Sequence, residues 1–333
     1  MGYRRLTYHL RSHSQIWAAR DEVYDSLKEV DAEGLEERRA GRLKRRIFHA
    51  DGPNQVWSLD GHDKLKRWGF AIHGCIDVYS RYIVWMRVGR SNNDARYVLS
   101  YYLDSLRQTT VDENGEERHG TRSCCLAYSY SFTVVVIPEK IRSDRGTETT
   151  DLYGYHLALH ALSGNLRPED SWVYGRSVHN QKIESLWSQM IKQWESEWQK
   201  TFKEIEWADE WALDNERQKR ALIFVYMPII RQEIAQWHRD HNVFPTRFNR
   251  LSRLPNGPPQ DNFMLSDQDF GVSVDSRHLE EIREGFLADF DADTYMSVEE
   301  QDHFNNLMLE SPLGPQINLH NARQQYRYLI GVR

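Results

Sequence analysis

Runs of apolar residues define the first structural elements of this chain. Residues 56–60 (VWSLD), 69–77 (GFAIHGCID) and 82–88 (YIVWMRV) are short and rich in β-branched and aromatic side chains. Such runs, bounded by turn-forming residues, predict β-strands. The intervening residues 78–81 (VYSR) leave room only for a tight turn. The second and third strands are therefore expected to form a hairpin.

The apolar spacing then lengthens to that of an α-helix. Helices are predicted over residues 93–107, 152–162, 178–200 and 218–238. A fourth strand is expected over 134–143, interrupted by Pro138 and Glu139. Three antiparallel strands, a helix, a parallel strand and further helices form a mixed α/β domain. This order is that of the ribonuclease H-like fold, a mixed sheet flanked by helices.

The first thirty residues follow a different pattern. They predict two helices with a break at residues 12–15. Leu6 and Leu10 form one apolar stripe, and the second helix has its own, formed by Trp17, Val23, Leu27 and Val30. Two short helices joined by a small turn fit the latter part of a helix-turn-helix, and they fit a generic helical hairpin equally well.

Composition sets broad limits. The 333 residues allow two or three domains and a sizeable core. No signal peptide and no apolar stretch of membrane-spanning length is found. The three cysteines, Cys75, Cys124 and Cys125, include no CxxC motif, and the adjacent pair cannot readily staple a fold. A reducing, intracellular compartment is therefore expected.

The net charge of −6 argues at first against a nucleic-acid partner, but its distribution reverses that impression. Residues 264–304 alone carry a net charge of −10, which leaves +4 on the rest of the chain. The densest basic run, residues 38–46 (RRAGRLKRR), holds six positive charges. By itself such a run is either a solvated linker or a phosphate-binding arm.

Three acidic residues stand in settings that suit a metal site. Asp60 ends the first predicted strand, Asp144 ends the fourth strand before the turn glycine Gly146, and Glu184 lies early in a long amphipathic helix. Strand-end aspartates and a helical glutamate can converge into one cage of carboxylate oxygens, the ligands that Mg²⁺ and Mn²⁺ prefer. This equipment is typical of nucleases and DNA strand-transfer enzymes.

Four motifs, in order, resemble the catalytic core of retroviral integrases and related transposases over residues 51–249. They are Trp57-Ser58-Leu59-Asp60, Ile76-Asp77-Val78-Tyr79-Ser80-Arg81, Arg142-Ser143-Asp144-Arg145-Gly146 and Asn180-Gln181-Lys182-Ile183-Glu184. The segments GPN (52–54), DG (60–61), KL (64–65) and YGRS (174–177) are most similar to transposon-derived integrase-core proteins of eukaryotic genomes.

The resemblance implies a fold, a reaction and partners. Asp60, Asp144 and Glu184 would be the catalytic and metal-binding triad of a DDE-type enzyme, holding two Mg²⁺ or Mn²⁺ ions. The expected reaction is metal-dependent hydrolysis and strand transfer of DNA phosphodiesters. DNA is the expected partner, with assembly as a homo-oligomer on it, no membrane association and a nuclear location. The alternative is a domesticated, inactive DNA-binding protein that keeps the fold.

Other residues are assigned lesser roles. Candidate DNA contacts are Arg42, Lys44, Arg45, Arg46, Tyr174, Arg176 and Lys192. Among the remaining acids, Asp77 is interpreted as a structural cap of the hairpin turn, and Glu195 and Glu197 are expected to face solvent. His9 and His13 have the spacing of two zinc ligands, as in the His-His-Cys-Cys domain of some integrases. No cysteine pair lies near them, which argues against zinc there.

Three regions are predicted. Residues 1–47 form partial helix-turn-helix-like helices and a basic linker, residues 48–250 the ribonuclease H-like core, and residues 251–333 an acidic extension of unknown function. Within the extension, the acids at 289, 291, 293 and 300 have calcium-loop spacing but Thr294 replaces the required glycine, which favours an acidic surface loop. The long connection 109–132 is either a surface loop or a gene-model artefact.

Overall fold

A five-stranded mixed sheet forms the centre of the computed structural model, which describes residues 3–32, 50–111, 117–118, 132–175, 181–248 and 253–331. The strands are β1 (Val56–His62), β2 (Ala71–Asp77), β3 (Ile83–Gly89), β7 (Lys140–Ser143) and β8 (Trp172–Tyr174). Their order is β3-β2-β1-β7-β8. Strands β1, β2 and β3 pair antiparallel, whereas β7 and β8 join in parallel beside β1. The predicted ribonuclease H-like arrangement is confirmed.

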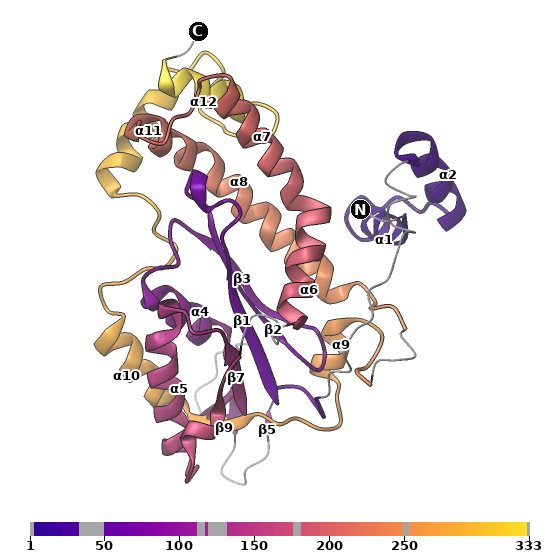
Figure 1. Ribbon diagram of the computed structural model, residues 1–333, viewed down its shortest axis with the longest axis vertical. Helices are drawn as coiled ribbons and strands as arrows, with labels where there is room; N and C mark the ends of the chain where they lie inside the picture. Colours follow the sequence, from indigo (N-terminus) through magenta and orange to yellow (C-terminus); the bar gives the residue numbers. More distant parts are fainter. Residues whose placement is uncertain are drawn as a thin grey trace.

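The alternating side chains of these strands build two cores, one on each face of the sheet. Ile72 and Ile76 of β2 pack with helices α6 (Gln181–Met190), α7 (Ser196–Trp207) and α8 (Glu216–Val243). Cys75 of the same strand packs with α4 (Ala95–Ser105) and α5 (Thr150–Leu162) on the other face. Figure 1 shows these two helical layers on either side of the sheet.

The predicted fourth strand proves to be two strands in two different sheets. Residues Phe132–Ile137 form β6, whereas β7 begins at Lys140. A second sheet, of order β5-β4-β6-β9, pairs β6 with β4 (Arg107–Val111) and with β9 (Val272–Asp275). Strand β5 (Glu117–Arg118) pairs with β4. The prediction was wrong because Pro138 ends the run of pairing residues and the chain then changes sheets.

The predicted long helix after residue 178 contains a local widening. Helix α6 continues through a π-helical turn (Ile191–Glu195) directly into α7. Helix α8 is longer than predicted and continues through Pro228. Short 3₁₀ turns at Lys66–Trp68, Thr147–Thr149 and Pro168–Ser171 complete the connections between elements. In the described part of the chain, no helix combines the length and apolar character needed to cross a membrane.

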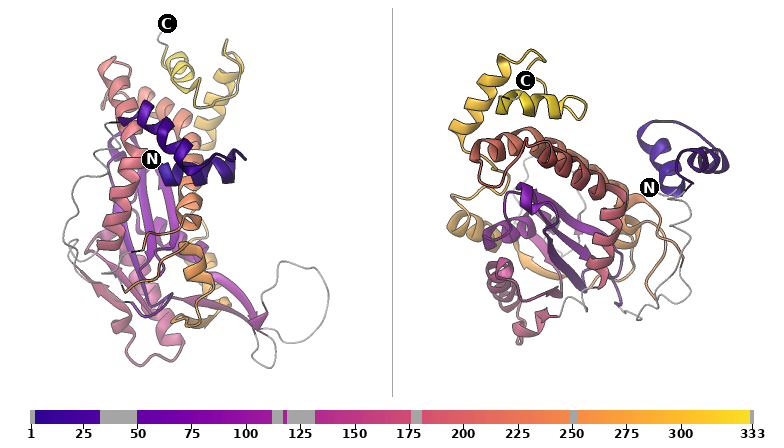
Figure 2. Two further views of the ribbon diagram at one scale, coloured as in Figure 1. Left: turned by 90° about the vertical axis from the view of Figure 1, so that its right-hand side faces the viewer. Right: turned by 45° about the horizontal axis from the view of Figure 1, so that its top comes forward.

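The N-terminal helices α1 (Tyr3–His13) and α2 (Arg20–Val30) form a pair at one side of the molecule, beside the α6–α8 layer (Figures 1 and 2). The two predicted helices are present, but α1 runs through His13 and α2 begins only at Arg20, so the break lies later than the predicted 12–15. The predicted apolar stripes were wrong in part, because α1 buries Arg5 and Thr7, and Trp17 and Val30 are exposed. Polar contacts of Arg5, His9 and His13 and the aromatic contact of Tyr8 with Phe244 therefore both hold α1 in place.

The residues after 251 complete both cores. They form α9 (Pro259–Met264), β9, α10 (Ser276–Phe286), α11 (Val298–Leu309) and α12 (Ala322–Ile330). Leu279 of α10 packs in the α4–α5 core, whereas Phe304 and Tyr326 pack in the α6–α8 core. This segment is therefore built into the same packing as residues 48–250, which its acidic composition did not indicate.

Candidate active site

Strand pairing places Asp60 beside Asp144. In the parallel pair β1–β7, Trp57 lies opposite Ile141 and Ser58 opposite Arg142. Because parallel strands end at the same edge of a sheet, Asp60 and Asp144, each two residues further along, reach that edge together. The backbone N–H of Gly146 donates to Asp144 Oδ1 over 3.3 Å, which helps to orient that carboxylate.

Helix α6 brings Glu184 to the same edge. Ile183 and Trp187 of the helix are buried against the sheet, while Glu184 on the adjoining face is exposed. Burial, with smaller contributions from the negative charges of Asp144 and Glu184, raises the pKa of Asp60 to about 7. Asp144 and Glu184 therefore lie within electrostatic reach of Asp60.

The donor set suits a divalent cation. The three carboxylates offer hard oxygen ligands, and the raised pKa of Asp60, which arises mainly from burial and in part from the charges of Asp144 and Glu184, means that a nearby cation would stabilise its ionised form. Asp60 and Asp144 are partly exposed and Glu184 is exposed, so an ion and a substrate can approach from solvent. Mg²⁺ or Mn²⁺ fits this chemistry.

A fourth carboxylate, Glu148, stands close to the acid cluster. Burial raises its pKa, and so do the charges of Asp144 and Asp63. A Cβ placed on Gly146 would come within 2.0 Å of Glu148 Oε2, so the glycine leaves room for this side chain. The Glu148 carboxylate therefore places additional negative charge near Asp144.

Trp187 supports Asp60 directly, a role that its helical spacing alone did not reveal. Its indole Nε1 donates to Asp60 Oδ2 over 3.0 Å. The ring covers Gly74, the partner of Asp60 across the β1–β2 pair, and a Cβ on Gly74 would lie 2.7 Å from the indole. The other side of the ring stacks on His62 with 4.8 Å between centroids. Trp187 therefore fixes the position of Asp60 as well as filling the core.

Behind Trp187 lies a buried ion-pair contact that corrects a prediction. His62 Nε2 is 2.6 Å from Glu195 Oε2, and the two side chains are 6% and 0% exposed. Glu195 was expected to face solvent, which is wrong; its neighbour Glu197 is exposed as expected. The error arises because Glu195 lies in the π-helical turn, where a regular helical period no longer gives the direction of a side chain.

Asp77 has the structural role that was predicted. Its Oδ1 accepts hydrogen bonds from the backbone N–H and the hydroxyl of Ser80, and its Oδ2 accepts from the N–H of Asn54. The side chain is fully buried, and burial raises its pKa to about 6. Asp77 therefore holds the β2–β3 turn and the segment leading into β1, away from the acid cluster.

The remaining candidates divide into three groups. Tyr174 is 45% exposed at the end of β8, and Lys192 is exposed in the π-helical turn. Arg42, Lys44, Arg45, Arg46 and Arg176 lie outside the described residues. In the acidic segment, Asp291 accepts hydrogen bonds from the N–H of Asp293 and the hydroxyl of Thr294, so these acids shape a turn.

A mixed five-stranded sheet with an acid in the second half of β1, another directly after β7 and a third in the first turn of α6 fits a ribonuclease H-like polynucleotidyl transferase fold. The model of one family, the integrase core domain, matches residues 47–129 and 116–256, more than half of the chain. The protein therefore belongs to the integrase core domain family, within the DDE superfamily. No curated protein matches the chain.

Proposed function

We propose that this protein is a DNA strand transferase that hydrolyses and rejoins phosphodiesters with the help of divalent metal. The proposal is supported by the pairing of β1 with β7, which brings Asp60 and Asp144 side by side, by the electrostatic effect of Glu184 on Asp60, and by the integrase-core match. Members of this family generally use divalent metals. Bound Mg²⁺ or Mn²⁺ would activate an attacking hydroxyl and stabilise the leaving oxygen at phosphorus.

The chain's own residues have separable tasks in this reaction. Asp60, Asp144 and Glu184 would hold the cations and thereby place the scissile phosphate. Trp187 keeps the Asp60 carboxylate in one orientation through its indole N–H. In each step a hydroxyl oxygen attacks phosphorus, the bond from phosphorus to the 3′ oxygen breaks, and the leaving oxygen takes a proton. Water is the attacking group in hydrolysis, and a DNA 3′ hydroxyl is the attacking group in strand transfer.

The decisive experiment is a nicking assay on supercoiled plasmid, with Mn²⁺ and with EDTA. Asp60→Asn, Asp144→Asn and Glu184→Gln should each lower the rate by about 100-fold or more, because each removes a charged metal ligand. Glu197→Gln is the matched control, since Glu197 is an exposed acid on the helix that continues from α6. Nicking that survives all three changes would refute the assignment of these acids. DNA binding without nicking in the wild type would instead identify an inactive relative that keeps the fold.

We propose DNA as the partner, bound in part through the basic run that contains Arg42, Lys44, Arg45 and Arg46. Replacing these four residues by Ala should weaken binding to every duplex and flatten the log–log salt dependence by about one unit per lost contact. Nicking at saturating DNA should change little. An unchanged salt slope would show that the run is a solvated linker. Tyr174, Arg176 and Lys192 would then be the remaining candidate DNA contacts.

Two further expectations accompany this proposal. A homo-oligomer should assemble on DNA, because two DNA ends must be held together for strand transfer, and the mass of the complex measured by light scattering tests this directly. A nuclear location follows from a DNA substrate, and fluorescence microscopy of the tagged full chain tests it.

A further inference from the structure

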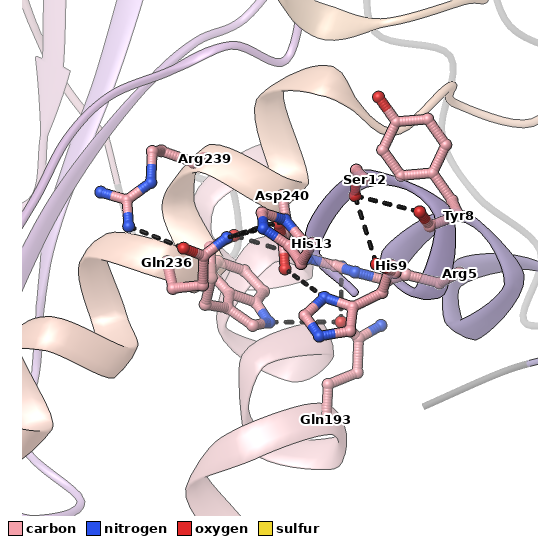
Figure 3. A network of polar contacts seen from close by, with 10 residues as sticks. Arg5, Tyr8, His9, Ser12, His13, Gln193, Gln236, Arg239 and Asp240 are labelled. Carbon is pink, nitrogen blue, oxygen red and sulfur yellow. Dashed lines mark hydrogen bonds and ion pairs between the residues drawn. The ribbon is translucent and has the colours of Figure 1, made fainter. Parts of the chain in front are cut away.

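Two histidines of the N-terminal helix face a carboxylate of the core. His9 and His13 lie one turn apart on α1, with 4.7 Å between ring centroids, and Asp240 lies near the end of α8. His9 Nδ1 is 3.1 Å from Asp240 Oδ2, and His13 Nε2 is 2.5 Å from Asp240 Oδ1. One ligand atom from each of the three residues lies within 4.8 Å of the others. Figure 3 shows the three side chains pointing toward one another.

We infer that His9, His13 and Asp240 bind one zinc-like divalent ion that fastens α1 to α8. Two imidazole nitrogens and one carboxylate oxygen are the ligands of a borderline-soft transition metal such as Zn²⁺, not of Mg²⁺. Three protein ligands leave a fourth position for water. The sequence offered no nearby cysteines to complete such a set, and the third ligand comes instead from a residue 227 positions from His13.

A neutral amide lies beside this cluster. Gln236 Nε2 lies 2.9 Å from His13 Nε2 and donates to Asp240 Oδ1 over 2.8 Å, and Gln236 Oε1 accepts from Arg239. Each neutral imidazole has one nitrogen with a lone pair that can bind a metal ion, and Asp240 supplies the negative charge that balances such an ion.

Arg5 lies near Asp240, but its guanidinium donates to other partners, and each Asp240 oxygen contacts one of the two imidazoles. Arg5 contributes a positive charge near Asp240, but its Nη1 donates to Gln193 and its Nη2 to the carbonyl of Trp237. The Asp240 side chain is only 10% exposed, whereas both histidine side chains are 34% exposed. The carboxylate is thus held by the core, while an ion can reach the imidazoles from solvent.

The proposed ion would have a mechanical task. Helix α1 buries two polar side chains, Arg5 and Thr7, and its Tyr8 ring lies edge-on to Phe244. A metal bridge between α1 and α8 would fix the N-terminal helix pair beside the α6–α8 layer. This site is independent of the acid cluster, and it would remain if the protein had no strand-transfer activity.

The test uses the full chain carrying Asp60→Asn, Asp144→Asn and Glu184→Gln, so that the acid cluster cannot take up added metal. After incubation with Zn²⁺ and gel filtration, elemental analysis should find about one zinc per chain, because a three-ligand site retains its ion. Hydrogen exchange of the α1 amides should slow by about tenfold or more with zinc. Millimolar Mg²⁺ should produce neither effect.

The matched variants separate binding from folding. His9→Asn with His13→Asn should lose the zinc and the protection of α1, whereas His303→Asn with His320→Asn, which alters two histidines elsewhere on the chain, should keep both. X-ray absorption at the zinc edge should show nitrogen and oxygen ligands with imidazole scattering. The inference is overturned if the parent chain retains no zinc, or if it retains zinc equally after both pairs of substitutions.

Discussion

Two contacts between a histidine and a carboxylate, in different regions of the molecule, have nearly the same length and opposite surroundings. His62 and Glu195 are 2.6 Å apart in the core behind the acid cluster, with side chains 6% and 0% exposed. His13 and Asp240 are 2.5 Å apart at the edge of the molecule, where the imidazole is 34% exposed. In the first pair, Trp187 stacks on the His62 ring. In the second pair, the imidazole of His9 also contacts Asp240.

The comparison shows that burial, rather than distance, decides what such a contact does. A pair enclosed by the core cannot exchange its partner, so it acts as a fixed support for the residues in front of it. A pair open to solvent has access to ions. The same two residue types therefore support the proposed catalytic edge in one place and offer ligands for a metal in another.

The largest expected effect comes from breaking the buried pair. Glu195→Ala should lower the free energy of unfolding by about 3–5 kcal/mol, because it leaves His62 in the core without its partner. Denaturant unfolding at neutral pH measures the loss. Glu197→Ala, an exposed neighbour, should change stability by about 0.5 kcal/mol or less.

At the exposed pair, His13→Asn in the presence of EDTA should cost about 1 kcal/mol or less. Equal losses at the two pairs would contradict the comparison.

A second prediction uses a buried imidazole that has no carboxylate partner. His73 is fully buried, accepts a hydrogen bond from Trp85 at Nδ1, and burial lowers its pKa to about 3. The unfolded chain therefore binds a proton that the folded chain does not, so stability should fall as pH drops below about 6.5.

From pH 7 to pH 5 the contribution of His73 should amount to about 2 kcal/mol. Asp60 and Asp77 act in the opposite direction, because their raised pKa values make the folded chain bind protons more readily in this range. The effect is therefore measured as a difference. Wild type should lose about 2 kcal/mol more than His73→Phe over this pH interval, and parallel pH profiles would count against burial of a neutral imidazole.

The smallest expected effect on stability concerns Trp187. Trp187→Phe keeps an aromatic ring but removes the N–H that binds Asp60, and should cost about 1 kcal/mol of unfolding free energy. It should also weaken Mn²⁺ binding by about tenfold, because Asp60 loses its orienting partner. Trp194→Phe is the control, since Trp194 on the same continuous helix donates to Glu233, away from the acid cluster. A loss of Mn²⁺ affinity in both variants would indicate a general effect on the helix.

Local patterns predicted much of the fold. The strands β1, β2 and β3, the helix α4 and the turn held by Asp77 all follow from short runs whose chemistry is set by immediate neighbours. The division of residues 132–143 between two sheets could not be predicted in the same way. One of the two partners of β6 is β9, more than a hundred residues away, and no local signal identifies such a partner.

The candidate site shows the same limit. Asp60, Asp144 and Glu184 were identified because each ends or begins an element in a recognisable motif. The environment of Asp60 was missed, since Trp187 had the spacing of an ordinary core residue and Glu195 that of a surface residue. The third member of the histidine cluster, Asp240, was also missed because tertiary packing brings it to α1.

Strand β9 has a practical consequence for anyone who shortens this protein. The family match ends at residue 256, and a chain cut there would lose β9 together with every backbone hydrogen bond that it makes to β6. Residues 132–137, with the sequence FTVVVI, would then form an uncovered edge with no charged side chain to discourage pairing. Such a segment is the kind that stacks with copies of itself. Truncation at the family boundary is therefore expected to expose the pairing edge of β6 and to promote aggregation.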